Sequence, residues 1–133
     1  MSQENVEVVR SAFEAWNAGH LERLAEFFEA DAEFLPFRAQ LEGIVYRGPQ
    51  GVRQFARDAR EEWDVLRIAS AEYRDLGEER VLVLGHMEGR AHASGMDLRV
   101  PAAWVIHMRG AKIAALRSYS NYEEALEAVG LRE

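Results

Sequence analysis

Three side chains that could act on a ligand alternate near the end of the chain. Arg117, Tyr119 and Asn121 occupy every second position of a predicted last strand, so they point to the same face of a sheet. A turn centred on Gly110-Ala111 places Trp104 opposite Arg117 on that face. In an apolar cavity, a guanidinium or a phenol would bind a carbonyl or enolate oxygen strongly, because a low dielectric strengthens such hydrogen bonds. Arg117 could instead stack on Trp104 as a cation–π pair, with Tyr119 at the rim of the fold.

A proton-transfer reaction would also need an acid or a base near this cluster. Glu33, on the short strand expected after the second helix, is the candidate base. Asp31 and Glu42 are more simply interpreted as a turn residue and a solvated loop residue. Asn121 can hydrogen-bond a ligand, but its amide neither gives nor takes a proton near neutral pH. Epoxide hydrolysis would need two inward aspartates around a water, and these are not evident in the sequence.

The four histidines do not have the arrangement of a metal site. His86, His92 and His107 fall on different strands and point away from the cluster. The chain has no cysteine, which excludes disulfides, thiolate catalysis and cysteine-based zinc sites. We therefore expect neither a metal nor an organic cofactor. A register slip of one residue would exchange the two faces, and His86, Glu88 and His107 would then form an inward acid–base set.

Other side chains are expected to form the wall of the binding site. Trp16 and Tyr46 each border a loop where the fold could open, so they could contact a ligand or pack at the rim. Met87 lies on the same predicted sheet face as the cluster. Gly85 and Gly89 remove side chains from this face of the central strand, which would make room for a ligand or let the sheet bend.

Hydrophobic periodicity and turn residues indicate the elements that would position these side chains. Three helices and one short strand come first, then four strands in succession, and a fourth helix closes the chain. Helices segregated from consecutive antiparallel strands make an α+β fold with one covered sheet face. The expected ranges are helices between Ser2 and Gly19 and around 21–28, 49–63 and 122–129, strands at 33–37 and 64–76, a loop at 38–47, and three strands within 81–121 that turn at Ser94-Gly95 and Gly110-Ala111.

The two turns also set the expected register of the last three strands. Counting from them places Met87 opposite Ala102, and Ala102 opposite Tyr119. The face that carries these residues is apolar until Arg117, so we expect helices to cover it. The opposite face has an aliphatic patch with a polar rim, which is typical of an interface. We therefore expect a homodimer through the outer sheet face, although a monomer could tolerate such a patch, which comprises Leu82, Leu84, Val105 and Leu116.

Bulk properties limit the class of protein. The 133 residues, 48% of them hydrophobic, are expected to form one domain spanning 1–133. A net charge of −7 disfavours nucleic acid and anionic membrane surfaces as partners. No apolar stretch approaches the roughly 20 residues of a membrane span. The acidic N-terminus does not resemble a secretory signal, so we expect a cytoplasmic protein.

Six segments follow one another along the chain, namely Ala15-Trp16-Asn17-Ala18-Gly19, Asp31-Ala32-Glu33, Tyr46-Arg47-Gly48-Pro49-Gln50-Gly51-Val52, 90–95, 104–113 and 124–131. Together, in this order, they resemble the SnoaL-like branch of the nuclear transport factor two-like superfamily. The resemblance implies a curved antiparallel sheet wrapped around helices to form a cone with an internal pocket. Members include polyketide cyclases, ketosteroid isomerases, epoxide hydrolases, dehydratases and proteins with no known activity, so the fold implies a pocket and not a reaction.

The sequence departs from the family at one functional position. SnoaL-like enzymes typically have Tyr-x-Asp near the end of the last strand, where the acidic residue is the general acid/base. This chain has Tyr119-Ser120-Asn121, so that role does not transfer to Asn121. The family also commonly dimerises through the sheet, which agrees with the apolar patch on the outer face.

The resemblance and the residues together predict a cone that binds a small apolar molecule. Trp104, Arg117, Tyr119 and Asn121 would orient the polar end of that molecule. An enzyme of this kind would be a cofactor-independent isomerase or cyclase, transferring a proton on a carbonyl-bearing substrate. Arg117 or Tyr119 would stabilise the oxyanion and Glu33 would be the base. The alternative is a non-catalytic ligand-binding module or dimeric adaptor.

Overall fold

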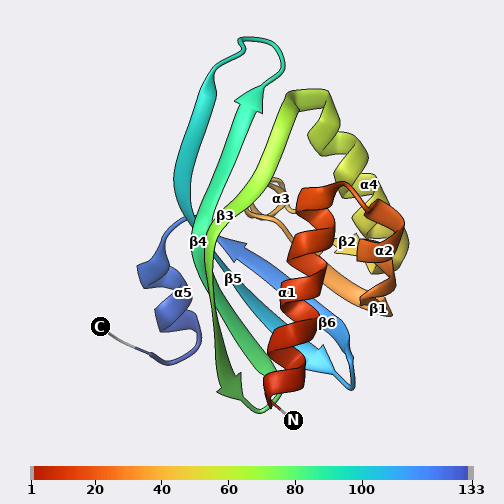
Figure 1. The fold of residues 1–133 in the computed structure, drawn as a ribbon, viewed down its shortest axis with the longest axis vertical. Helices are drawn as coiled ribbons and strands as arrows, with labels where there is room; N and C mark the ends of the chain where they lie inside the picture. The colour runs from red at the N-terminus through yellow and green to blue at the C-terminus, as the bar shows by residue number, and fades with distance from the viewer. Residues whose placement is uncertain (1, 132–133) are drawn as a thin grey trace.

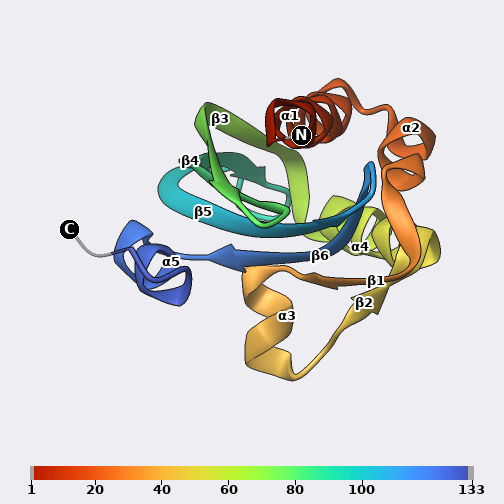
Figure 2. The ribbon, with the colours of Figure 1, turned by 90° about the horizontal axis from the view of Figure 1, so that it is seen from below.

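A strongly curved six-stranded sheet organises the computed structural model, which describes residues 2–131 (Figures 1 and 2). The strand order is β2-β1-β6-β5-β4-β3. Neighbouring strands are antiparallel except β1 and β6, which run parallel. The strands are β1 (Phe28–Leu35), β2 (Tyr46–Arg47), β3 (Trp63–Gly77), β4 (Arg80–Ala91), β5 (Asp97–Arg109) and β6 (Lys112–Tyr119). The expected α+β fold with a curved sheet is confirmed.

Two groups of helices flank this sheet. α1 (Ser2–Ala18) lies in the concave side against β3 and β4, while α2 (Leu21–Glu26) and α4 (Gly48–Glu62) pack on each other and on β1 (Figure 2). α3 (Phe37–Glu42) contacts β6, and α5 (Tyr122–Ala128) packs on the opposite face against β5 and β6. No helix within 2–131 has the length and apolar character needed to cross a membrane.

Local sequence explains where the principal helices begin and end. Val6, Val9 and Phe13 recur at helical spacing and are buried, so α1 presents one apolar stripe to the sheet. At the start of α4, Gly48 has a φ of +64°, and a Cβ there would collide with the carbonyl oxygen of Ala30. Pro49 follows within the first turn of α4. Glycine is therefore required at the tight connection from β2 into α4.

One end of the concave face is a dry core. Val81, Val83, Ile106 and Ile113 have no exposed surface and pack in one cluster with Val9 of α1. These residues come from β4, β5 and β6, so the core joins three neighbouring strands to α1. Burial of branched aliphatic side chains at close-packed density supplies most of the stabilisation in such a cluster.

The predicted register of β4 on β5 is wrong by two residues. Met87 pairs with Val100, and Gly85 pairs with Ala102. The turn is longer than the two-residue loop expected from Ser94-Gly95, since the amide of Ala91 donates to the carbonyl of Met96 at 3.0 Å. A shift of two residues keeps every side chain on its predicted face.

The predicted register of β5 on β6 is wrong by one residue, with larger consequences. The turn at Gly110-Ala111 forms as expected, because Arg109 pairs with Lys112. The register then shifts between the pairs Met108–Ile113 and His107–Ala115, which leaves one extra residue on β6 as a β-bulge. Beyond this bulge Trp104 pairs with Ser118, and all later β6 side chains exchange faces relative to the prediction.

The outer aliphatic patch is covered within the same chain. Leu82 and Val105 are buried, and they form a cluster with Ala125 and Leu126 of α5. Leu116 lies on the inner face, where it joins the main core. The surface from which we predicted a dimer interface is thus occupied by α5, which was expected as a helix but whose packing on this face was not predicted. Homodimerisation through the outer sheet face stays a prediction.

Most element predictions hold, with differences concentrated between β1 and α4. The range 38–47, expected as a loop, contains most of α3 and all of β2. β1 begins at Phe28 and not at Glu33, and Trp63 opens β3 although its spacing extends the apolar stripe of α4. The short α3 has a left-handed C-cap at Gly43 with a φ of +71°, which is a frequent way to end a helix.

Candidate functional site

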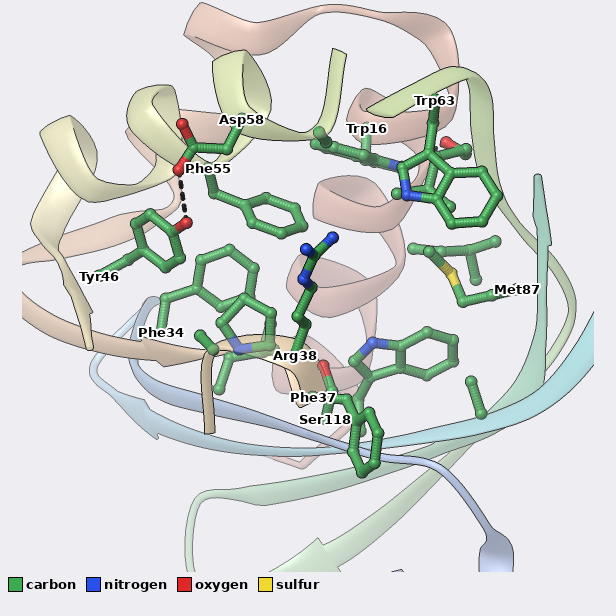
Figure 3. Close-up of a pocket in the computed structure, with 18 of the residues that line it drawn as sticks. Trp16, Phe34, Phe37, Arg38, Tyr46, Phe55, Asp58, Trp63, Met87 and Ser118 are labelled. Carbon is green, nitrogen blue, oxygen red and sulfur yellow. Dashed lines mark hydrogen bonds between the residues drawn. The ribbon is translucent and has the colours of Figure 1, made fainter. Parts of the chain in front are cut away.

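An aromatic cavity of about 750 Å³ opens at the end of the concave face away from the dry core (Figure 3). Its wall combines residues from α1, α2, α3 and α4 with residues from all six strands. A concave, mostly apolar site of this size with a few polar groups is typical of small-molecule binding. The aromatic members of the wall are Phe13, Trp16, Phe28, Phe34, Phe37, Tyr46, Phe55, Trp63, Trp104 and Tyr119.

Phe55 of α4 is the centre of one aromatic wall. Its ring centroid lies 4.8 Å from that of Phe34 in an edge-to-face contact and 5.7 Å from that of Tyr46. Trp16 of α1 completes this wall with a centroid distance of 5.5 Å to Phe55. Edge-to-face and tilted contacts are favourable aromatic geometries. The rings therefore form a rigid surface in which α1, α4, β1 and β2 meet.

Side-chain hydrogen bonds fix α1 to β3 beside the cavity. The indole N–H of Trp16 donates to the carbonyl of Leu66 at 2.9 Å. The Asn17 amide bridges one strand residue, donating to the carbonyl of Ile68 at 2.8 Å and accepting from its N–H at 2.8 Å. Both residues belong to the Ala15–Gly19 segment, so this segment anchors the helix end to the sheet.

Tyr46 and Asp58 form a hydrogen-bonded pair in the wall (Figure 3). The phenol donates to Asp58 Oδ2 at 2.6 Å, and Gln54 Nε2 donates to Asp58 Oδ1 at 2.8 Å. Burial, followed by the hydrogen bond to Asp58, raises the pKa of Tyr46 to about 12. The same hydrogen bond, with that from Gln54, lowers the pKa of Asp58. At neutral pH the pair is therefore a neutral phenol bound to a carboxylate.

The mouth of the cavity combines charged side chains with exposed apolar ones. Arg38 of α3 extends across the middle of the view in Figure 3 and forms an ion pair with Glu62 at the end of α4. Glu42 lies 3.7 Å from the same guanidinium. Around these groups the rim exposes large apolar side chains at 37–42% of their surface, namely Phe37, Ile44, Leu98 and Val100.

Four predicted ligand-binding residues line the cavity. Trp16, Tyr46, Met87 and Trp104 are all part of its wall. Trp104 is 5% exposed and packs edge-to-face on Phe13 with a centroid distance of 5.2 Å. The predicted wall positions on α1, β4 and β5 therefore coincide with the observed cavity.

The predicted catalytic residues do not come together inside the cavity. Arg117 is exposed on the outer face, where its guanidinium lies 5.6 Å from the centroid of Tyr119 and not over Trp104. Tyr119 borders the cavity, but its ring packs against the outer cluster beneath α5. The β6 bulge is the reason, since it turns both side chains outward.

Glu33 and Asn121 also have structural positions outside the cavity. Glu33 is exposed and pairs with Arg47 at 3.1 Å across β1 and β2. Asn121 is the N-cap of α5, where its side-chain oxygen accepts from the Glu124 amide at 2.8 Å. Asparagine is among the preferred N-cap residues, so a helix start accounts for this position.

The glycines of β4 do not leave space for a ligand. A Cβ at Gly89 would lie 2.8 Å from Cε3 of Trp63, whose ring covers this glycine. A Cβ at Gly85 would lie 2.8 Å from the carbonyl oxygen of Ala69, in the irregular part of β3. Both glycines permit close approach of β3 to β4, which agrees with the interpretation that they let the sheet bend.

Ser118, Asp58 and the charged mouth were not predicted from the sequence. Ser118 was hidden by the bulge, which no periodicity revealed. A signal for Asp58 and Glu62 was present, since they follow Phe55 at positions i+3 and i+7 and so share one side of a helix. No such signal existed for Arg38, because α3 itself was not predicted.

The alternative with exchanged faces is not realised. His86, Glu88 and His107 remain on the outer face, while Met87 and Trp104 line the cavity. Glu88 is engaged there by Arg99 at 3.0 Å and Arg67 at 3.6 Å. Within 2–131, no three His, Cys, Asp or Glu side chains come together in a way that could hold a metal ion.

Known proteins resemble this chain in sequence and in fold. Residues 9–116 match the SnoaL-like domain family, whereas no curated protein sequence matches the chain. A candidate polyketide cyclase from Xanthomonas campestris pv. campestris superposes with a TM-score of 0.81 at 18% identity, covering 97% of this chain and 98% of that one.

Two further structures with similar folds contain bound molecules. A Catenulispora acidiphila protein with a ketosteroid isomerase-like fold, in complex with trimethylamine, gives a TM-score of 0.76 at 18% identity, covering 94% of this chain and 93% of that one. TerC, co-crystallised with polyporic acid, gives a TM-score of 0.78 at 18% identity, covering 95% and 98%. At these identities the likeness establishes a shared fold.

Proposed function

The chain belongs to the SnoaL-like domain family, and on that premise we propose that its cavity binds a small, largely apolar molecule. The carrying observation is the aromatic cavity of about 750 Å³ that is open at a charged mouth. A polyaromatic or other ring-shaped ligand fits the aromatic wall formed by Trp16, Phe34 and Phe55. The structures with trimethylamine and polyporic acid support this proposal, because they place small molecules in complexes with proteins of the same fold.

The ionisable groups around the cavity support ligand binding better than they support catalysis. The carboxylates of the wall stand at the mouth, where Asp58 accepts two hydrogen bonds and Glu62 pairs with Arg38. The carboxylate expected as a base, Glu33, is outside the cavity. General acid–base catalysis requires a titratable group within hydrogen-bond reach of the reacting atom.

Intrinsic fluorescence tests the binding proposal directly, because all three tryptophans of the chain line the cavity. Titration with naphthalene, a neutral two-ring probe, should change the tryptophan emission and saturate. The melting temperature should rise with probe concentration, since the probe binds only the folded state. A Phe55→Glu variant, which puts a charge into the wall, should abolish both effects.

A variant that carries the same new charge on the surface is the matched control. Leu41 is 73% exposed and is not part of the cavity wall, so Leu41→Glu should bind naphthalene like the unmodified protein. If naphthalene and other apolar ring probes produced neither a saturable emission change nor a melting shift, the binding proposal would be rejected.

A second candidate function is proton transfer on a carbonyl-bearing substrate without a cofactor. It is favoured by one observation, namely that the Asp58 carboxylate lies in the wall beside the apolar site. Asp58 would take a proton from the carbon next to a carbonyl and return it to the same substrate. Its lowered pKa makes it a weak base, so this reaction would be slow.

Hydrogen–deuterium exchange distinguishes this candidate from binding alone. Methyl naphthyl ketone in heavy water should exchange its methyl hydrogens faster with the protein than without it, as followed by proton NMR. Asp58→Asn should remove the acceleration, while Glu33→Gln should retain it, because Glu33 is outside the cavity. Exchange at the rate of buffer alone would exclude proton transfer on this class of substrate.

A further inference from the structure

The three tryptophans differ in what their indole N–H groups bind. That of Trp16 donates to the Leu66 carbonyl. Those of Trp63 and Trp104 have no hydrogen-bond partner within residues 2–131, although both rings line the cavity. An indole N–H can only donate, so any partner must be an acceptor atom. Two of the three indoles are thus unused donors.

Trp104 is the more informative of these two residues. Its ring is 95% buried (5% exposed) between the core and the cavity. Among the described residues, the side-chain atoms that are completely enclosed and also unpartnered are Arg80 Nε and His86 Nδ1. Trp104 Nε1 is not one of them, so it is unpartnered without being sealed in protein. Its N–H is therefore open to the cavity that the ring lines. Buried donors ordinarily have a hydrogen-bond acceptor.

Ser118 places a second hydrogen-bonding group beside this indole. Trp104 and Ser118 are direct partners on β5 and β6, and opposed residues of an antiparallel pair have their Cβ atoms about 5 Å apart on the same face. The Ser118 hydroxyl lines the cavity and makes no hydrogen bond within the described chain. Figure 3 shows Ser118 close to Phe37 and to the backbone end of the Arg38 side chain.

Both residues are held in position by their surroundings. The Trp104 ring packs on the edge of Phe13, and its strand neighbour Val83 is fully buried. The Ser118 carbonyl accepts from Gln40 Nε2 at 2.8 Å, which fixes the backbone of β6 against α3. A donor with a fixed position discriminates between ligands, because little ordering is needed on binding.

We propose that Trp104 Nε1–H and the Ser118 hydroxyl together bind an acceptor oxygen of the ligand, such as the carbonyl of a ketone, quinone or ester. The inference rests on the proposed function, since it assigns the polar contact of the same cavity. At the mouth, the Arg38 guanidinium forms an ion pair with Glu62 and the Tyr46 phenol donates to Asp58. In this proposal, Trp104 and Ser118 select oxygen-bearing ligands over hydrocarbons of equal shape.

Two probes of one shape test this selectivity. Methyl naphthyl ketone and isopropenylnaphthalene differ only in a C=O group that replaces C=CH₂, so their apolar contacts are matched. Isothermal titration calorimetry should show the ketone binding about fivefold tighter to the unmodified protein, as expected for one net neutral hydrogen bond. Trp104→Phe and Ser118→Ala should each bring the affinity ratio of the two probes towards one.

Trp16→Phe is the matched control, because it also removes an indole N–H from the wall but one that is already bonded to Leu66. It should weaken both probes alike and leave their affinity ratio at about fivefold. Ser118→Ala is a small change on a half-buried residue, so it keeps the test available if Trp104→Phe does not fold.

The outcomes separate this inference from the binding proposal. Equal affinity of the two probes for the unmodified protein would overturn the inference and leave the binding proposal intact. A preference for the ketone that survives in both Trp104→Phe and Ser118→Ala would also overturn it. Failure of both probes and of naphthalene to bind would reject the binding proposal itself.

Discussion

The two ends of the concave sheet face have similar apolar composition but different roles. At one end, Val83 and Ile106 of β4 and β5 are sealed beneath α1 with no exposed surface. Further along the same strands, Met87 and Val100 line an open cavity. All four side chains follow the same alternation along their strands. The difference shows that an apolar face becomes core or binding wall according to which helix covers it.

Coverage differs because the helices contact different strands. α1 packs against β3 and β4, and Val9 and Phe13 of its apolar stripe pack into the core at the dry end. α4 packs mainly against β1, β2 and α2, and therefore forms the far wall of the cavity instead of closing it. Aromatic residues meet between the two helices and hold this separation, with Trp16 against Phe55.

Removal of a side chain from the dry end should have the largest effect on stability. Ile106→Ala leaves a void that its close-packed neighbours cannot fill, so we expect the free energy of unfolding to fall by about 3 kcal/mol. Met87→Ala, at the cavity end, should cost about 1 kcal/mol or less, since Met87 borders existing space. Urea unfolding of both variants measures the difference. Equal losses would contradict the division of this face into core and wall.

Gly89→Ala should disturb the mouth through Trp63. The new methyl group would meet Trp63 Cε3 and Cζ3 at 2.8 and 2.9 Å, so the ring must move. We expect a loss of about 1–2 kcal/mol in unfolding free energy, together with a shift in tryptophan emission. Gly85→Ala is the control, because its methyl group meets the backbone of β3 and should destabilise the fold without the emission shift. An unchanged emission in Gly89→Ala would contradict the contact.

Tyr46→Phe should lower stability by about 1 kcal/mol at neutral pH and flatten its pH dependence. Tyr46 has a pKa of about 12 in the fold and about 10 when unfolded, so its contribution is complete below pH 10 and is lost between pH 10 and 12. The pKa of Asp58 is lowered, so its contribution is present above its ordinary pKa and is lost as acid protonates the folded carboxyl.

Thermal unfolding across the pH range checks this expectation. The unmodified protein should lose stability at both extremes, and Tyr46→Phe should lose less at each of them. Tyr122→Phe removes a phenol that donates to the Gly85 carbonyl at 2.7 Å, with no carboxylate partner, and serves as the control. Identical acid and alkaline profiles for the unmodified protein and Tyr46→Phe would show that the pair makes no linked contribution.

Arg38→Gln should have the smallest effect on stability and a measurable one on ligand exchange. The Arg38 and Glu62 side chains are 63% and 47% exposed, and such ion pairs contribute about 0.5 kcal/mol or less. Loss of the ion pair across the mouth should accelerate naphthalene association in stopped-flow fluorescence, and high salt should do the same for the unmodified protein. Arg109→Gln removes a comparable pair with Glu29 away from the cavity and should not alter the rate.

The sequence by itself determined α1, α2, α4 and α5, the turn at Gly110-Ala111, and the inward positions of Met87 and Trp104. Each of these follows from patterns within a few residues, namely periodicity, a turn glycine or alternation along a strand. The positions of Trp16 and Tyr46 in the wall were also predictable, because both border loops at the open end. The family and the α+β fold followed from the order of these local elements.

Only the tertiary structure decided the inward residues of β6 and the cover on the outer face. Next to the bulge, the Ile113 amide donates to the Phe27 carbonyl at 2.8 Å, and Lys112 Nζ donates to the Glu26 carbonyl at 3.0 Å. These contacts join segments more than 80 residues apart, so no local pattern in β6 could reveal them. A one-residue bulge exchanges faces, and it therefore placed Ser118 in the cavity and Arg117 outside it.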